Sequence, residues 1–123
     1  MGSKNYLVTG ASKGIGRSIA MALADEGHTV ILLARESEQL AASCRDVQEI
    51  SSASFAVSCD LANRASIDLI VEKLIELDSI DGIVHNAGTI APIQSMFDAE
   101  NADWARNIEV NLIGVQRLTK GLY

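Results

Sequence analysis

The sequence has 123 residues, of which 48% are hydrophobic and 21% are charged. This length is typical of one domain, and the apolar content excludes a chain that is disordered throughout. Sixteen acidic residues against ten basic ones give a formal net charge of -6. A phosphate backbone binds proteins with the opposite excess of charge, so we expect no nucleic acid partner.

Membrane and metal binding are also disfavoured. No uncharged apolar run reaches the roughly 18 residues of a membrane helix, and we expect neither an anchor nor an export signal. Cys44 and Cys59 lack metal-ligand spacing, which favours two reduced thiols in a cytoplasmic protein. His28 and His85 are equally isolated, so we expect no metal site.

Four short apolar runs predict β-strands, because each is too short for a helix and is bounded by turn residues. Their unbroken apolar character is typical of strands that are covered on both faces. The runs lie at residues 6–9, 29–34, 55–59 and 82–85.

Helix-like segments separate these strands. Ile15, Ile19 and Leu23 recur every four residues, and Gly27 stands where a helix would end. The second helix is expected over residues 37 to about 51 with Ser37 as its N-cap, and the third over 65–77. A final helix after a long loop has apolar residues on more than one side: Trp104, Ile108, Leu112, Val115, Leu118 and Leu122.

The alternation of strands and helices predicts one continuous α/β domain with a parallel sheet and right-handed crossovers. Such sheets bind ligands at the carboxyl ends of their strands. The loop after the first strand has the pattern G-x-x-x-G-x-G in Gly10, Gly14 and Gly16. Glycines let backbone amides approach a pyrophosphate at a helix N-terminus, so this loop predicts dinucleotide binding rather than a merely tight turn.

The end of the second strand bears on the choice of dinucleotide. A site for NAD usually has an acidic residue there, whereas a guanidinium accommodates the 2′-phosphate of NADP. Here Ala34 is followed by Arg35, and Lys13 in the glycine loop adds a second positive charge. Both cations are also compatible with a solvated surface. The pattern favours NADP.

Four motifs together resemble the short-chain dehydrogenase/reductase family over residues 5–123: residues 9–16, 59–61, 85–88 and Asn111. The resemblance implies a Rossmann-like doubly wound parallel sheet of about four strands in the order 3-2-1-4. It also implies that Asn111 helps to organise a catalytic proton relay. The cofactor-binding residues are expected to be Gly10, Ser12, Lys13, Gly14, Ile15, Gly16, Arg35, Asp60, Leu61, Asn86, Ala87 and Gly88.

The resemblance also suggests which part of the cofactor each motif contacts. Ser12, Lys13 and Ile15 would contact phosphates, Asp60 and Leu61 the adenine, and residues 86–88 the adenine and ribose. Structural roles remain open for several of them. Asp60 could cap a neighbouring turn, and Asn86 could tie adjacent strands together.

Two departures from the family pattern matter. His85 stands where the family commonly has a second asparagine, and the catalytic serine and Tyr-x-x-x-Lys motif are absent. Tyr123 is too close to Asn111 to be the catalytic tyrosine, so we assign it no catalytic role. We therefore expect residues 1–123 to be the NADP-binding half of a longer reductase domain, and the loop residues Ile90, Pro92 and Ile93 to lie near its substrate.

The complete enzyme would transfer hydride between NADP(H) and a small-molecule carbonyl or secondary alcohol, and we expect it to be a homo-oligomer. The strand at 82–86 and the final helix would offer apolar surface for that association. One alternative is a catalytically silent NADP-binding or scaffolding module. A nucleoside-cofactor methyltransferase is a second alternative, but it calls for an acidic residue where Ala34 and Arg35 stand.

Overall fold

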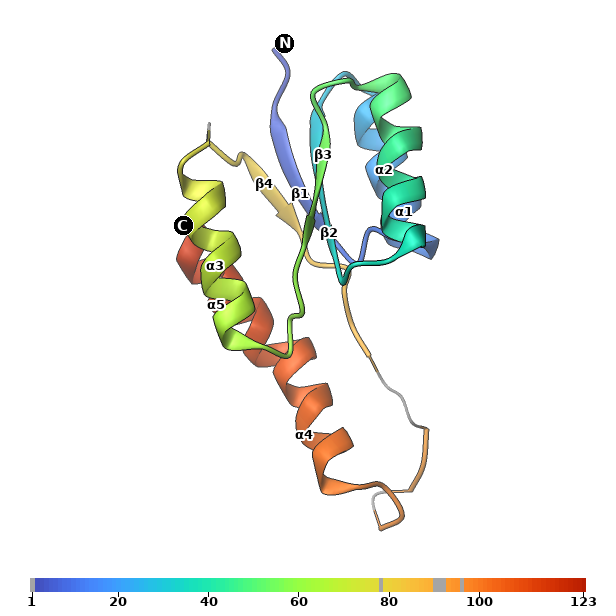
Figure 1. Ribbon diagram of the computed structural model, residues 1–123, viewed down its shortest axis with the longest axis vertical. Helices are drawn as coiled ribbons and strands as arrows, with labels where there is room; N and C mark the ends of the chain where they lie inside the picture. Colours follow the sequence, from blue (N-terminus) through green and yellow to red (C-terminus); the bar gives the residue numbers. More distant parts are fainter. Residues whose placement is uncertain (1, 78, 90–92, 96) are drawn as a thin grey trace.

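The four strands form one parallel sheet in the computed structural model, which describes residues 2–77, 79–89, 93–95 and 97–123 (Figure 1). Their order is β3-β2-β1-β4, which confirms the expected Rossmann-like topology. Cys59 and His85, which were expected within strands, lie directly after them. The strands are β1 (Asn5–Thr9), β2 (Thr29–Ala34), β3 (Phe55–Ser58) and β4 (Gly82–Val84).

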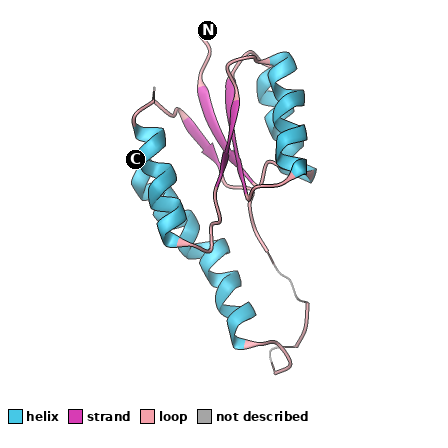
Figure 2. Cartoon of the chain, viewed as in Figure 1, coloured by secondary structure: helices cyan, strands magenta, loops and turns pink. Residues whose placement is uncertain are grey.

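Helices cover both faces of the sheet, as a doubly wound fold requires (Figure 2). One pair consists of α1 (Gly14–Asp25) and α2 (Glu38–Ile50), and the other of α3 (Arg64–Ile75) and α5 (Gly114–Leu122). Alternate strand residues point to opposite faces. The first pair packs on a core that contains Val8, Val30 and Leu32, and the second on a core that contains Leu7, Ile31 and Leu33.

The fully buried residues of α1 are smaller than those of its apolar spacing. The buried residues are the small ones Gly16, Ala20 and Ala24, whereas Ile15 is 73% exposed. Small side chains allow the helix axis to approach the sheet closely, and the same close approach leaves no room for larger residues there. The spacing of Ile15, Ile19 and Leu23 predicted the helix correctly, and Ile19 and Leu23 are partly buried against the same core as Ala20 and Ala24.

Helix α2 begins where the sequence predicted. The Ser37 hydroxyl oxygen accepts a hydrogen bond from the Leu40 amide at 3.1 Å, which satisfies one of the free donors of the first turn. An ion pair between Arg17 and Asp46 joins α2 to α1. Helix α2 is therefore fixed at its start and along its side.

The last predicted helix is not a continuous α-helix. It consists of α4 (Asn101–Ile108), the π-helical turn η1 (Glu109–Ile113) and α5. A π turn holds more residues than an α turn and is often found at functional sites. Asn111, which the family resemblance assigns to a proton relay, lies inside η1.

Helix α4 extends away from the sheet, at the lower end of the view in Figure 1. Large apolar side chains of α4 and η1 are exposed to solvent. Trp104 in α4 is 55% exposed, and Leu112 in η1 is 63% exposed. Among the described residues, no helix combines the length and the apolar character needed to cross a membrane. The strands β3 and β4 are the outer strands of the sheet.

Candidate functional site

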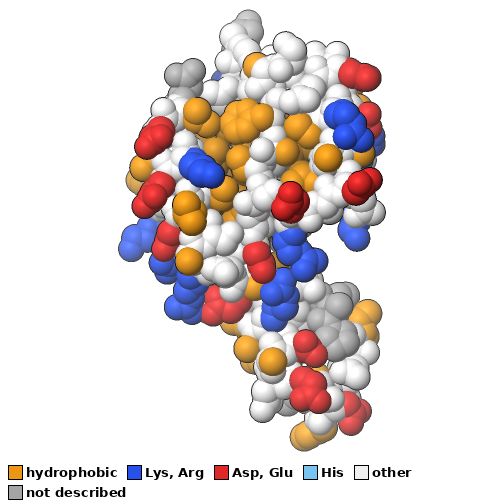
Figure 3. Space-filling view, viewed as in Figure 1, with side chains coloured by type: hydrophobic (Ala, Val, Ile, Leu, Met, Phe, Trp, Pro, Cys, Tyr) orange, Lys and Arg blue, Asp and Glu red, His pale blue; other side chains and the backbone are white. Residues whose placement is uncertain are grey.

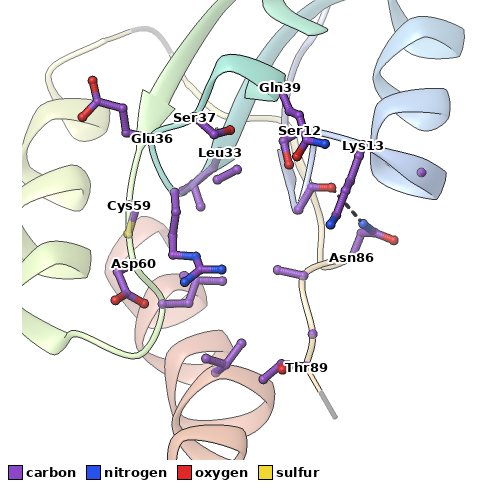
Figure 4. A pocket seen from close by; sticks show the side chains of 18 of the residues that line it. Ser12, Lys13, Leu33, Glu36, Ser37, Gln39, Cys59, Asp60, Asn86 and Thr89 are labelled. Carbon is purple, nitrogen blue, oxygen red and sulfur yellow. Dashed lines mark hydrogen bonds between the residues drawn. The ribbon is translucent and has the colours of Figure 1, made fainter. Parts of the chain in front are cut away.

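A cleft of about 660 Å³ lies at the carboxyl ends of the strands (Figure 4). All of the predicted cofactor-binding residues except Gly16 line it. The loops after β1, β2, β3 and β4 each contribute, so the topology brings together residues that are far apart in the sequence. Lining residues that the sequence motifs did not indicate are Leu33, Glu36, Ser37, Gln39, Thr89, Arg106 and Val110.

The glycine loop forms one wall of the cleft and leads into the N-terminus of α1. Gly14 has a φ of 57°, and a Cβ atom built on it would meet nothing within 4 Å, so the loop is open toward the cleft there. Gly16 serves a different purpose. A Cβ atom on Gly16 would lie 2.1 Å from the Gly10 carbonyl oxygen, so only glycine allows this contact between loop and helix.

The Thr9 hydroxyl group ties the glycine loop to the segment after β4. Its buried oxygen accepts hydrogen bonds from the amides of Asn86 at 3.1 Å and Ala87 at 3.0 Å. The Asn86 side-chain amide donates to the Gly10 carbonyl at 3.2 Å, close to Lys13 in Figure 4. Asn86 thus has the structural role that the sequence left open, and it also lines the cleft.

Asp60 also has a structural role. Its Oδ1 atom accepts a hydrogen bond from the Ala62 amide at 2.9 Å, which caps the turn after β3. The same atom lies 3.3 Å from the Arg106 guanidinium, which reaches it from α4. This contact helps to hold α4 beside the cleft.

The two predicted cations stand at the same cleft. Within the described ranges of the chain, the side chains of Lys13 and Arg35 form no hydrogen bond or ion pair. Lys13 and Asp60 lie on opposite sides of the cleft in Figure 4. Basic and acidic side chains lie together beside the hollow between the sheet and α4 (Figure 3). Glu36 also lines the cleft, and the two cations without a partner among the described residues suit it to an anionic ligand.

Asn111 lies next to the cleft without lining it. Its side-chain oxygen accepts a hydrogen bond from the Thr89 amide at 2.8 Å, and its amide donates to the Thr89 carbonyl at 2.7 Å. These two bonds fix the backbone that follows Gly88. Of the three loop residues expected near a substrate, Ile90 and Pro92 lie outside the described residues, and Ile93 is 84% exposed.

Both cysteines are free and buried, as the sequence predicted. Burial raises the pKa of the Cys59 thiol, so it stays protonated and unreactive despite lining the cleft. In the part of the chain that the structure describes, no group of three or more His, Cys, Asp or Glu side chains could hold a metal ion.

His85 forms a contact with α5 that the sequence did not indicate. Its Nε2 atom lies 2.8 Å from the Thr119 hydroxyl oxygen, and this hydroxyl group donates to the Val115 carbonyl at 2.7 Å. The ring therefore links the end of β4 to α5. Partial desolvation lowers the pKa of His85, so the folded chain favours its neutral form.

We expect this shift to make the free energy of unfolding fall as the pH is lowered from about 7.5 to about 5.5. The unfolded chain, with a histidine pKa near 6.5, takes up the proton before the folded chain does, so stability decreases through this range. His85→Gln should flatten the dependence, as measured by urea unfolding at the two pH values. A dependence that is unchanged in His85→Gln would contradict the assignment.

The comparisons with known proteins agree with one another. The family model described as short chain dehydrogenase matches residues 4–123. The 3beta-hydroxysteroid dehydrogenase of Mediterraneibacter gnavus is 33% identical over 110 residues, which are 89% of this chain and 40% of that protein. The NADPH-dependent pterin aldehyde reductase of Arabidopsis thaliana is 31% identical over 119 residues, 96% of this chain and 49% of that protein.

Solved structures share the fold. The L-sorbose reductase from Gluconobacter frateurii, complexed with NADPH and L-sorbose, matches with a TM-score of 0.89 and 30% identity, over 99% of this chain and 47% of that one. A metagenomic short-chain oxidoreductase in complex with NADP matches with a TM-score of 0.89 and 31% identity, over 97% of this chain and 54% of that one. The chain thus spans about half the length of these relatives.

Proposed function

The chain belongs to the short-chain dehydrogenase family, and on this premise we propose that its cleft binds NADP. The observation that carries the proposal is the position of Arg35 and Lys13, two cations without a partner among the described residues, at the carboxyl end of the sheet. Cationic donors are what a dianionic 2′-phosphate requires. Relatives that are named as NADPH-dependent or were solved with NADP(H) support the same choice.

The residues of the cleft fit such a dinucleotide. The open space at Gly14 leaves the N-terminus of α1 accessible, and a pyrophosphate is stabilised there by free amides and the helix dipole. Ser12 and Ile15 line this end of the cleft. In this proposal Asp60 and Leu61 contact the adenine, and residues 86–88 contact the adenine and ribose.

We further propose that the protein to which these residues belong is an oxidoreductase that acts on a small-molecule carbonyl or secondary alcohol. A bound nicotinamide would supply or accept the hydride. The contribution of this chain is to bind and orient the dinucleotide. The Asn111 side chain would support this by fixing the Thr89 backbone beside the cleft, in addition to the proton-relay role that the family resemblance implies.

Association into a homo-oligomer is part of the proposal. Three apolar side chains, Trp104, Ile108 and Leu112, follow one another at four-residue steps along α4 and η1, and each is more than a third exposed. An apolar stripe of this kind is typical of a surface that another subunit covers. The two buried free thiols are consistent with the reducing cytoplasm.

Calorimetric titration of the chain with NADP⁺ and with NAD⁺ tests the cofactor. We expect NADP⁺ to bind at least about tenfold more tightly, because the two cations contact only its extra phosphate. The difference should shrink at high salt, since part of it is electrostatic. Equal affinities for the two cofactors, or no binding of either, would refute the proposal.

A further inference from the structure

A buried serine on α2 contacts the side of the glycine loop that faces this helix. Ser43 is 1% exposed, and its hydroxyl group donates a hydrogen bond of 2.8 Å to the Ser12 carbonyl. A serine inside a helix commonly bonds to the carbonyl four residues earlier in its own helix. Here the hydroxyl group instead joins two segments that lie 31 residues apart.

This bond sets the orientation of a peptide group in the cleft wall. A trans peptide is planar, and its C=O and N–H bonds point in opposite directions. Because the Ser12 carbonyl points toward α2, the Lys13 amide points away from α2. Ser12 and Lys13 both line the cleft, as Figure 4 shows. Among the described residues the Lys13 amide donates to no protein group, so it is free to donate to a ligand.

The start of helix α2 lies next to Arg35, the other half of the anionic site. Its N-cap Ser37 follows Arg35 by two residues, and the cap fixes the turn that bears this arginine. Ser43 lies less than two turns further along the same helix. One rigid element therefore holds the arginine turn at its start and the glycine loop at its side.

We propose that Ser43 is a positioning residue for the dinucleotide: it holds the 12–13 peptide so that the Lys13 amide donates to the pyrophosphate. The proposal rests on the NADP-binding function proposed above. It concerns only the contacts to the pyrophosphate and predicts no change in the contacts to the 2′-phosphate. Loss of the Ser43 hydroxyl group should therefore weaken the binding of ligands that contain a pyrophosphate more than the binding of ligands that lack one.

The first test uses the unaltered chain. Amide chemical shifts followed by nuclear magnetic resonance during titration with NADP⁺ should place Lys13 among the amides that move. Titration with 2′-AMP, which has the 2′-phosphate but no pyrophosphate, should move the Lys13 amide shift less than NADP⁺ does, because it contacts only the Lys13 side chain. A Lys13 amide that NADP⁺ does not affect would overturn the proposal, whatever the behaviour of any variant.

The second test compares Ser43→Ala with Ser54→Ala. Ser54 is 2% exposed, and its hydroxyl oxygen accepts a hydrogen bond of 2.9 Å from the Val30 amide, outside the cleft. Both variants lose one buried hydrogen bond from a serine. We expect Ser43→Ala to weaken NADP⁺ binding about three- to tenfold, the usual value of one hydrogen bond, and Ser54→Ala to leave it within about twofold.

The affinity for 2′-AMP distinguishes positioning from a general structural effect. It should stay within about twofold in Ser43→Ala, and a loss equal to that for NADP⁺ would overturn the proposal. If Ser43→Ala does not fold, Ser43→Cys replaces it, because a thiol is close to the hydroxyl group in shape but is a weak donor. We expect this variant also to lose more affinity for NADP⁺ than for 2′-AMP. Failure of the unaltered chain to bind NADP⁺ would instead refute the proposed function.

Discussion

Replacing Gly14 by valine should lower the affinity for NADP⁺ about 10- to 100-fold, the loss expected when one or two charge-assisted hydrogen bonds are blocked. A Cβ atom at Gly14 meets no protein atom within 4 Å, so the branched side chain would enter the open space of the cleft. It would stand where the backbone amides of the glycine loop are proposed to meet the pyrophosphate. Calorimetric titration measures the effect.

Gly27 offers a matched control at the other end of α1. Its φ of 89° is also positive, and a Cβ atom there is equally free of contacts. Valine at either position is therefore expected to cost about 1–2 kcal/mol of folding stability through backbone strain. Only Gly14→Val should weaken NADP⁺ binding. If the two folded variants bind NADP⁺ with equal affinity, the glycine loop does not contact the pyrophosphate as proposed.

The double variant Ala34→Asp/Arg35→Ala should reverse the preference between NADP⁺ and NAD⁺. The new carboxylate would repel the 2′-phosphate and could accept a hydrogen bond from the ribose hydroxyl of NAD⁺, while the guanidinium is lost. We expect the ratio of the two affinities to change roughly 100-fold, as two such charged contacts would give. The measurement is a pair of titrations on each protein.

Arg45→Ala is the control for the loss of one positive charge. Arg45 is an exposed arginine on α2 that does not line the cleft, so its loss changes the net charge without touching the site. The affinity ratio should remain as in the unaltered chain. A double variant that keeps its preference for NADP⁺ within a factor of two would show that Arg35 does not recognise the 2′-phosphate.

Local patterns were sufficient to predict most of the fold. Unbroken apolar runs indicated all four strands, and the Ser37 cap located the start of α2 within one residue. Which residues of α1 are fully buried could not be predicted in this way. It depends on how closely the Gly16 backbone approaches Gly10, a tertiary contact that hydrophobic spacing does not encode.

The same distinction applies to the candidate site. Residues in contiguous motifs, such as Ser12 and Asn86, could be named from the sequence because the loops that carry them follow strands. Ser43 and Arg106 could not, since each lies in a helix without a motif and reaches the site through a partner 31 or 46 residues away. Only the folded chain reveals such contacts.

The π-helical turn at Glu109–Ile113 bears on how this chain can change in length. Hydrogen bonds from residue i to i+5 enclose one residue more than those of an α-helix, so a π turn is equivalent to a single-residue insertion that the helix has absorbed. Each residue turns an α-helix by about 100°, which is enough to move a side chain from one face to the next. Leu118 is fully buried in α5, while Asn111 reaches Thr89. Loss of one residue from this turn would rotate these two positions relative to each other, so the helix could keep its buried leucine or its asparagine bond, but not both.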